Sequence, residues 1–101
     1  MRRARAGRSP VGDNDEQRAL AVLGLRRGEQ VRFRRSAAGR WAEGFVTRRE
    51  RDGSIGLADT KGAARAIPVE LIEVRCTGPR GGLAWEPLTT RASRSEQLRL
   101  L

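Results

Sequence analysis

Hydrophobic and polar residues alternate in several short runs between residues 29 and 75, and turn-forming residues separate these runs. In the first run, Val31 and Phe33 fall on one face of an extended chain, whereas Arg32 and Arg34 fall on the other. A period of two residues is typical of β-strands with one buried face. The pattern predicts five strands, over residues 29–35, 41–51, 55–57, 64–67 and 72–75.

Turn residues and strand faces together define the inside of the predicted sheet. Asp52-Gly53 and Lys61-Gly62 predict tight hairpin turns, because glycine accepts a positive φ without steric cost. Pro68 ends the fourth strand, and a single helical turn is expected over residues 69–71. Trp41, Glu43, Phe45 and Thr47 share the outer face of the second strand. The predicted interior consists of Val31, Phe33, Gly44, Val46, Ile55 and Leu57.

A helix is expected before the strands, over residues 13–24. Asp13 and Glu16 have the spacing of an N-terminal capping pair, and Gly24 is a natural C-terminal stop. Its apolar face would seal one end of the strand region or serve as an interface for another protein. That face consists of Ala19, Leu20, Val22 and Leu23.

The C-terminal part is expected to hold a flexible loop over residues 77–84, because of its glycine and proline content. A second helix is expected to begin near Pro87, with Trp85, Leu88 and Ala92 on one side and a break near Ser93. The predicted organisation is a basic disordered arm (1–12), an N-terminal helix and linker (13–28), a small β-barrel (29–76), and a loop with a C-terminal helix or tail (77–101). The arm is either a solubilising leader or a tail that follows phosphates.

The turn positions, the strand facing and the Ile67-Pro68 end of the fourth strand resemble Tudor-like modules over residues 29–75. The resemblance implies a mainly β fold, a small five-stranded Src-homology-3-like (Tudor-type) barrel flanked by the two helices. Tudor domains that bind methylated side chains need a cage of three or four aromatic residues. This chain has only four aromatic residues and no tyrosine, so a methyl-binding role is disfavoured. Nucleic-acid-associated barrels of the KOW kind remain the nearest likeness, and no site residue is transferred from them.

Composition narrows the chemistry further. The chain carries 21 Lys and Arg against 12 Asp and Glu, a net charge of +9, which favours a polyanionic partner. There is no histidine, and the single cysteine, Cys76, excludes an intramolecular disulfide. No nucleophile motif, phosphate loop or metal-ligand spacing is present, so we expect no enzyme activity, no cofactor and no metal site. No apolar run approaches membrane-spanning length, and we expect a cytoplasmic protein, associated with the nucleoid or ribosome, without a membrane partner.

The excess positive charge of the strand region lies in the predicted first hairpin, where residues 31–52 carry a net charge of +4. We therefore expect sequence-tolerant binding of DNA or RNA through this hairpin. Trp41 would either stack on a base or pack with Phe45 beneath the C-terminal helix. The candidate nucleic-acid-binding residues are Arg32, Arg34, Arg35, Arg40, Trp41, Arg48 and Arg49.

An alternative function rests on the last five residues, Gln97-Leu98-Arg99-Leu100-Leu101. They are similar to the pentapeptide by which bacterial replication and repair proteins dock on the DNA sliding clamp. In that resemblance the glutamine fits a polar subsite and apolar side chains fill a pocket. The chain would then be a protein-interaction adaptor of replication, repair or transcription, with Gln97, Leu98, Leu100 and Leu101 as partner-binding residues. The barrel face around Trp41 and Phe45 is the other surface that such an adaptor would use.

Overall fold

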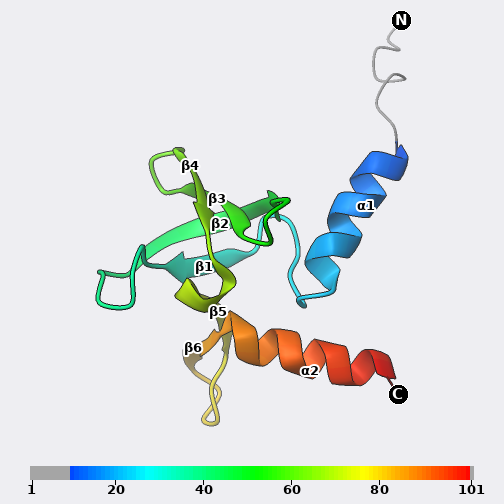
Figure 1. Ribbon diagram of the computed structural model, residues 1–101. Coiled ribbons are helices and arrows are strands. Elements are labelled where there is room, and N and C mark those ends of the chain that lie inside the picture. The colour runs from blue at the N-terminus through cyan, green and yellow to red at the C-terminus, as the bar shows by residue number, and fades with distance from the viewer. Residues whose placement is uncertain (1–9, 101) are drawn as a thin grey trace, which may run out of the picture.

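The computed structural model describes residues 10–100. The fold is mainly β, a six-stranded antiparallel open sheet with two helices. The strands are β1 (Gln30–Phe33), β2 (Ala42–Arg49), β3 (Ile55–Asp59), β4 (Ala64–Ile67), β5 (Ile72–Thr77) and β6 (Leu83–Pro87). Their order in the sheet is β4-β3-β2-β1-β5-β6, so β4 and β6 form its edges (Figure 1).

The helices lie at the two ends of the sequence. Helix α1 (Pro10–Ala21) precedes the sheet, and α2 (Leu88–Leu100) follows β6 directly. A 3-10 turn, η2 (Val69–Leu71), joins β4 to β5. Helix α1 packs against β2, whereas α2 packs against η2, β5 and β6. Neither helix of the described residues is long and apolar enough to cross a membrane.

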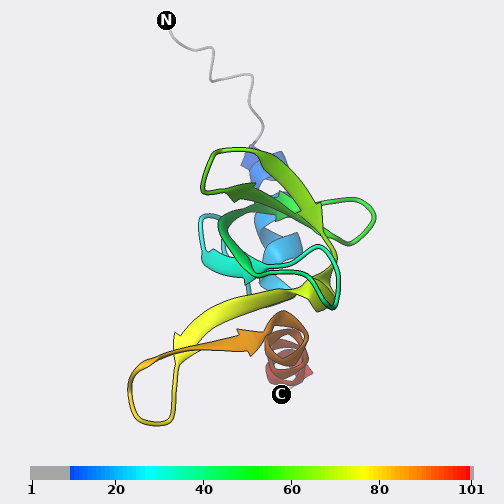
Figure 2. The same cartoon turned by 90° about the vertical axis from the view of Figure 1, so that its left-hand side faces the viewer.

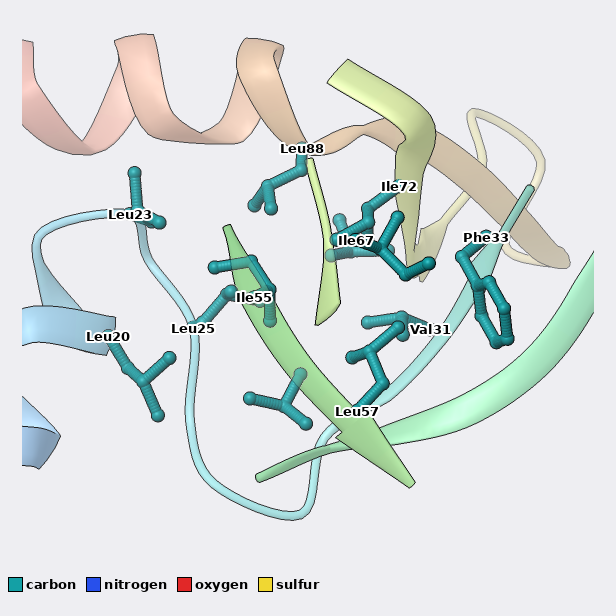
Figure 3. Close-up of a cluster of buried hydrophobic side chains, with 12 residues drawn as sticks. Leu20, Leu23, Leu25, Val31, Phe33, Ile55, Leu57, Ile67, Ile72 and Leu88 are labelled. Atoms are coloured by element: carbon teal, nitrogen blue, oxygen red, sulfur yellow. The ribbon is translucent and has the colours of Figure 1, made fainter. Parts of the chain in front are cut away.

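The hydrophobic core confirms the predicted interior of the strands. Val31, Phe33, Val46, Ile55 and Leu57 are buried, and Gly44 is buried with them. Gly44 is needed there because a Cβ at this position would lie 2.7 Å from the carbonyl oxygen of Ala58. Figure 3 shows how other segments complete this core: Leu20 on α1, Leu23 and Leu25 just after it, Ile67 on β4, Ile72 on β5 and Leu88 on α2. Val74 on β5 belongs to the same core.

The end of α1 explains how its side chains reach the core. Gly24 has a φ of +76°, its N–H donates to the carbonyl of Ala21, and the N–H of Leu25 donates to the carbonyl of Leu20. These two bonds form a Schellman motif, in which the apolar residues on either side of the glycine contact each other. Leu20 and Leu25 are both buried, so the motif fixes the direction in which the chain leaves the helix.

Four expectations about the flanking segments were wrong. Helix α1 begins at Pro10 and not at Asp13, because proline suits the first helical position. Residues 10–12, which were expected to belong to the disordered arm, are therefore helical. Residues 1–9 of that arm lie outside the described residues. Val22 is 38% exposed instead of joining the apolar face. Helix α2 continues through Ser93 without a break.

The fourth correction concerns residues 77–84, which form a hairpin instead of a flexible loop. Strand β5 extends to Thr77, and β6 pairs with it from Leu83 to Pro87. Gly81 has a φ of +85° and its N–H donates to the carbonyl of Gly78, so the glycines build a tight turn. The hairpin adds a sixth strand and projects beyond the rest of the sheet (Figure 2).

Candidate nucleic-acid interface

Arginine and tryptophan side chains alternate across β1, β5, β6 and the loop between β1 and β2. The Cζ of Arg34 lies 4.4 Å from the ring centroid of Trp41, and the Cζ of Arg32 lies 4.3 Å from the same centroid. Arg32 also lies 5.1 Å from the ring centroid of Trp85, which Arg75 approaches at 5.9 Å. We call this series, Arg34, Trp41, Arg32, Trp85 and Arg75, the Arg–Trp ladder. Each contact has the separation of a cation–π interaction.

Hydrogen bonds fix the middle of the ladder. The Nε of Arg32 donates to Oε1 of Glu73, its neighbour on β5, over 2.9 Å. Arg75 donates to the side-chain oxygen of Gln30 over 2.6 Å, and Gln30 donates in turn to Glu43 over 2.8 Å. The charge of Arg32 is therefore compensated within the fold, and its main role there is to bridge β1, β2, β5 and β6.

The surroundings of Trp41 are built by two arginines and not by the C-terminal helix. Trp41 stacks against Arg32 and Arg34 and is half-buried, whereas α2 packs against η2, β5 and β6. Phe45 is 45% exposed on the outer face of β2. The expectation that both rings pack beneath the C-terminal helix was wrong, because the added hairpin of β5 and β6 carries that helix away from β2.

Arg48 and Arg49 lie at the far end of β2, about 23 Å along the strand from Trp41. Arg48 is paired with Glu50 at 3.3 Å, and the hydrogen bond that it donates to this carboxylate raises the pKa of Arg48. Arg49 donates to the carbonyl of Ala19 and so helps hold α1 against the sheet. The structure thus separates these two arginines from the other candidates of the hairpin.

Arg34, Arg35 and Arg40 do come together, in a hollow between the β1–β2 loop and the β3–β4 turn. Its volume is about 380 Å³. Lys61 and Arg65 complete its positive lining, and the only acids that line it are Glu43 and Asp59. We call this site the basic hollow. It is lined by Phe33, Arg34, Arg35, Gly39, Arg40, Ala42, Glu43, Asp59, Thr60, Lys61 and Arg65.

The cations of the basic hollow are incompletely compensated. Of the five, only Arg65 is paired within residues 10–100, with Asp59 at 3.2 Å. Arg35, Arg40 and Lys61 are exposed. The Nε of Arg34 is buried and has no hydrogen-bond acceptor among the described residues. Like charges gathered in one hollow repel each other, and an anion bound there would relieve that repulsion.

Asp59 shapes the wall of the basic hollow that β3 and β4 provide. One carboxylate oxygen accepts hydrogen bonds from the backbone N–H groups of Lys61 and Ala63, each at 2.9 Å, and the other accepts from Arg65. The bond from Ala63, with those from Lys61 and Arg65, lowers the pKa of Asp59. Asp59 is thus a structural acid that places Lys61 and Arg65 at the hollow.

Acid is expected to weaken this turn. A carboxyl whose pKa is lower in the folded than in the unfolded chain stabilises the fold above the unfolded pKa, near 3.9. That contribution is lost as the pH falls through the lower folded pKa. We therefore expect the denaturation midpoint to fall as the pH decreases below about 4, and to fall less steeply in Asp59→Asn. Parallel pH profiles of the two proteins, measured by urea denaturation, would contradict this role of Asp59.

The C-terminal segment is helical up to Leu100, as part of α2. Gln97 is exposed and Leu98 is 65% exposed, whereas Leu101 lies outside the described residues. Docking of residues 97–101 as an extended peptide would require the last turn of α2 to unwind.

Sequence reasoning missed several residues of this region. Trp85 was expected on one side of the C-terminal helix, but it lies on β6. No sequence pattern indicated that Lys61, Arg65, Glu73 or Arg75 belongs to the site. The alternation of Leu83, Trp85 and Pro87 after a glycine turn was a usable signal for β6. The contacts across β1 and β5 depend on strand register, which a local pattern does not reveal.

Within residues 10–100, no group of three or more His, Cys, Asp or Glu side chains could hold a metal ion. Comparison with protein-family models, characterised proteins and solved structures found no significant match to this chain.

Proposed function

We propose that this chain is a non-enzymatic module that binds DNA or RNA with little sequence preference, and that the basic hollow holds phosphate groups of the ligand. The observation that carries the proposal is the gathering of Arg35, Arg40 and Lys61 around one hollow without an ion-pair partner among the described residues. Arg34 adds a fourth cation, whose buried Nε–H has no acceptor among the described residues. Phosphate oxygens are the acceptors that such a set of donors would recognise.

The physical basis of this binding is the release of counterions. Each phosphate neutralised by a lysine or arginine frees cations condensed on the nucleic acid, and this favours binding most at low salt. The net charge of +9 adds an attraction that acts over longer distances. Arg32, Arg48 and Arg49 have partners within the fold. The binding site is therefore centred on the β1–β2 loop and does not extend over the whole first hairpin.

We also propose that β1 to β5 form a small Src-homology-3-like barrel of the Tudor type, to which β6 is added. Support comes from the strand order β4-β3-β2-β1-β5 and from the pairing of β1 with both β2 and β5. The 3-10 turn η2, which follows Pro68 and joins β4 to β5, is a further feature of the resemblance.

A titration of labelled oligonucleotides tests the proposed function. We expect single- or double-stranded DNA or RNA to bind at about 50 mM salt, with an affinity that falls about ten-fold or more at 200 mM. Fluorescence anisotropy at the two salt concentrations measures both quantities. A protein of similar size and negative net charge serves as the control for non-specific signal. If no oligonucleotide bound at low salt, the proposed function would be wrong.

A further inference from the structure

We infer, on the basis of the proposed function, that the ligand is a single strand, whose backbone lies in a groove along β4 while one of its bases stacks on Phe45. Three features of the described residues carry this inference: a second hollow that continues the first, an uncovered aromatic ring beside it, and the occupation of both tryptophan rings by arginines.

The second hollow extends the basic hollow along the open edge of the sheet. It has a volume of about 450 Å³ and is lined by Arg35, Ala64, Arg65, Ala66, Ile67 and Pro68. Arg35 and Arg65 line both hollows, so the two hollows are neighbours, and we call them together the groove. Strand β4 pairs only with β3, so no strand of the described residues covers its outer edge. The groove can therefore follow more than one phosphate of an extended strand.

Phe45 lies on the same face of the sheet as Ala64, one of the residues that line this groove. It pairs across β2 and β3 with Ala58, which pairs across β3 and β4 with Ala64. The ring is 45% exposed, since alanines are too small to cover it. Ala64 lies two strands away from Phe45, a separation of about 10 Å. A base and its own backbone could thus contact the ring and the groove together.

The two tryptophans are less suited to this role than Phe45. Trp41 lies against Arg32 and Arg34, and Trp85 lies against Arg32 and Arg75. No arginine or lysine of the described residues occupies the ring of Phe45 in the same way. A base that stacked on either tryptophan would have to displace an arginine, whereas Phe45 offers its ring without that cost.

Only a single strand can use both surfaces. In a duplex the faces of the bases are stacked on each other, and the outside presents phosphates and base edges. An unpaired base can turn its face towards an aromatic side chain, a contact that is common in proteins that bind single strands. The groove alone would accept phosphates from either form, so Phe45 is the residue that distinguishes them.

The test compares a single-stranded 12-mer with the matching duplex, for the intact chain and three variants. We expect tighter binding of the single strand, and a loss of about five- to fifty-fold in Phe45→Ala for the single strand only. Phe45→Leu, which keeps an apolar side chain without a π face, should lose nearly as much. Val22→Ala removes another exposed apolar side chain, just after α1 and away from the groove, and should bind normally.

The outcomes separate the two proposals. Equal affinity for duplex and single strand, together with an unchanged Phe45→Ala, would overturn the single-strand inference and leave the proposed function intact. Binding of neither form at low salt would overturn both. If Phe45→Leu bound the single strand normally while Phe45→Ala bound it weakly, the contact would be an apolar one without base stacking. That result would also overturn the inference.

Discussion

Replacing Arg91 with alanine is expected to lower the free energy of unfolding by about 3 kcal/mol, because the change leaves the half-buried Glu29 without its counter-charge and removes hydrogen bonds to two backbone carbonyls. Arg91 lies on α2 with a side chain that is only 18% exposed. It is paired with Glu29 and with Glu86, both of which are 16% exposed. Its guanidinium also donates to the backbone carbonyls of Gly24 and Arg75. One side chain thus joins α2 to the end of α1, to β5 and to β6.

Arg94→Ala is the matched control for this prediction. Arg94 also lies on α2 and is paired with Glu86, at 2.8 Å, but its side chain is 55% exposed. The hydrogen bond from Arg94 is the largest cause of the lowered pKa of Glu86, yet exposed ion pairs contribute little to stability, about 0 to 1 kcal/mol. Urea denaturation followed by tryptophan fluorescence measures both variants. Equal destabilisation of Arg91→Ala and Arg94→Ala would contradict the central role of Arg91.

The second large effect concerns the basic hollow. The triple variant Arg35→Glu, Arg40→Glu and Lys61→Glu is expected to weaken binding of oligonucleotides at low salt by roughly a hundred-fold or more. The plot of log affinity against log salt should become shallower by about 3, because each cation lost removes one phosphate contact. All three side chains are exposed, so the fold should tolerate the changes.

A variant of equal charge separates the site from the net charge. Arg26, Arg27 and Arg80 are also exposed and make no ion pair with another described residue, but they lie outside the basic hollow. Replacing these three with glutamate changes the net charge by the same amount. Binding in this control should weaken much less, and equal losses in the two triple variants would contradict the location of the site.

Much of the sheet could be predicted from the sequence, because the positions that decide it are local. Val31 and Phe33 alternate with arginines, and the glycines of Asp52-Gly53 and Lys61-Gly62 adopt the positive φ angles that tight turns require. The same local rules were wrong for residues 77–84. Glycine and proline occur in flexible loops and in tight turns alike, and only the pairing of Thr77 with Leu83 decides between them.

The candidate site could be predicted only in part, because the distribution of charge along the chain does not show which charges have partners. Arg34, Arg35 and Arg40 do line one hollow, as their closeness in sequence suggests. Arg32, however, is held by Glu73, which is 41 residues further along the chain. Arg49 contacts the carbonyl of Ala19 on α1. Such partners depend on strand register and helix packing, and they determine which arginines remain accessible to a ligand.

The most direct test of the central claim is a side-by-side titration of one labelled oligonucleotide with the intact chain and the two triple variants at about 50 mM salt. The account predicts binding by the intact chain, a much smaller loss in the Arg26, Arg27 and Arg80 variant, and a loss of roughly a hundred-fold or more in the Arg35, Arg40 and Lys61 variant. Undiminished binding by the Arg35, Arg40 and Lys61 variant would contradict it, as would an intact chain that does not bind at all.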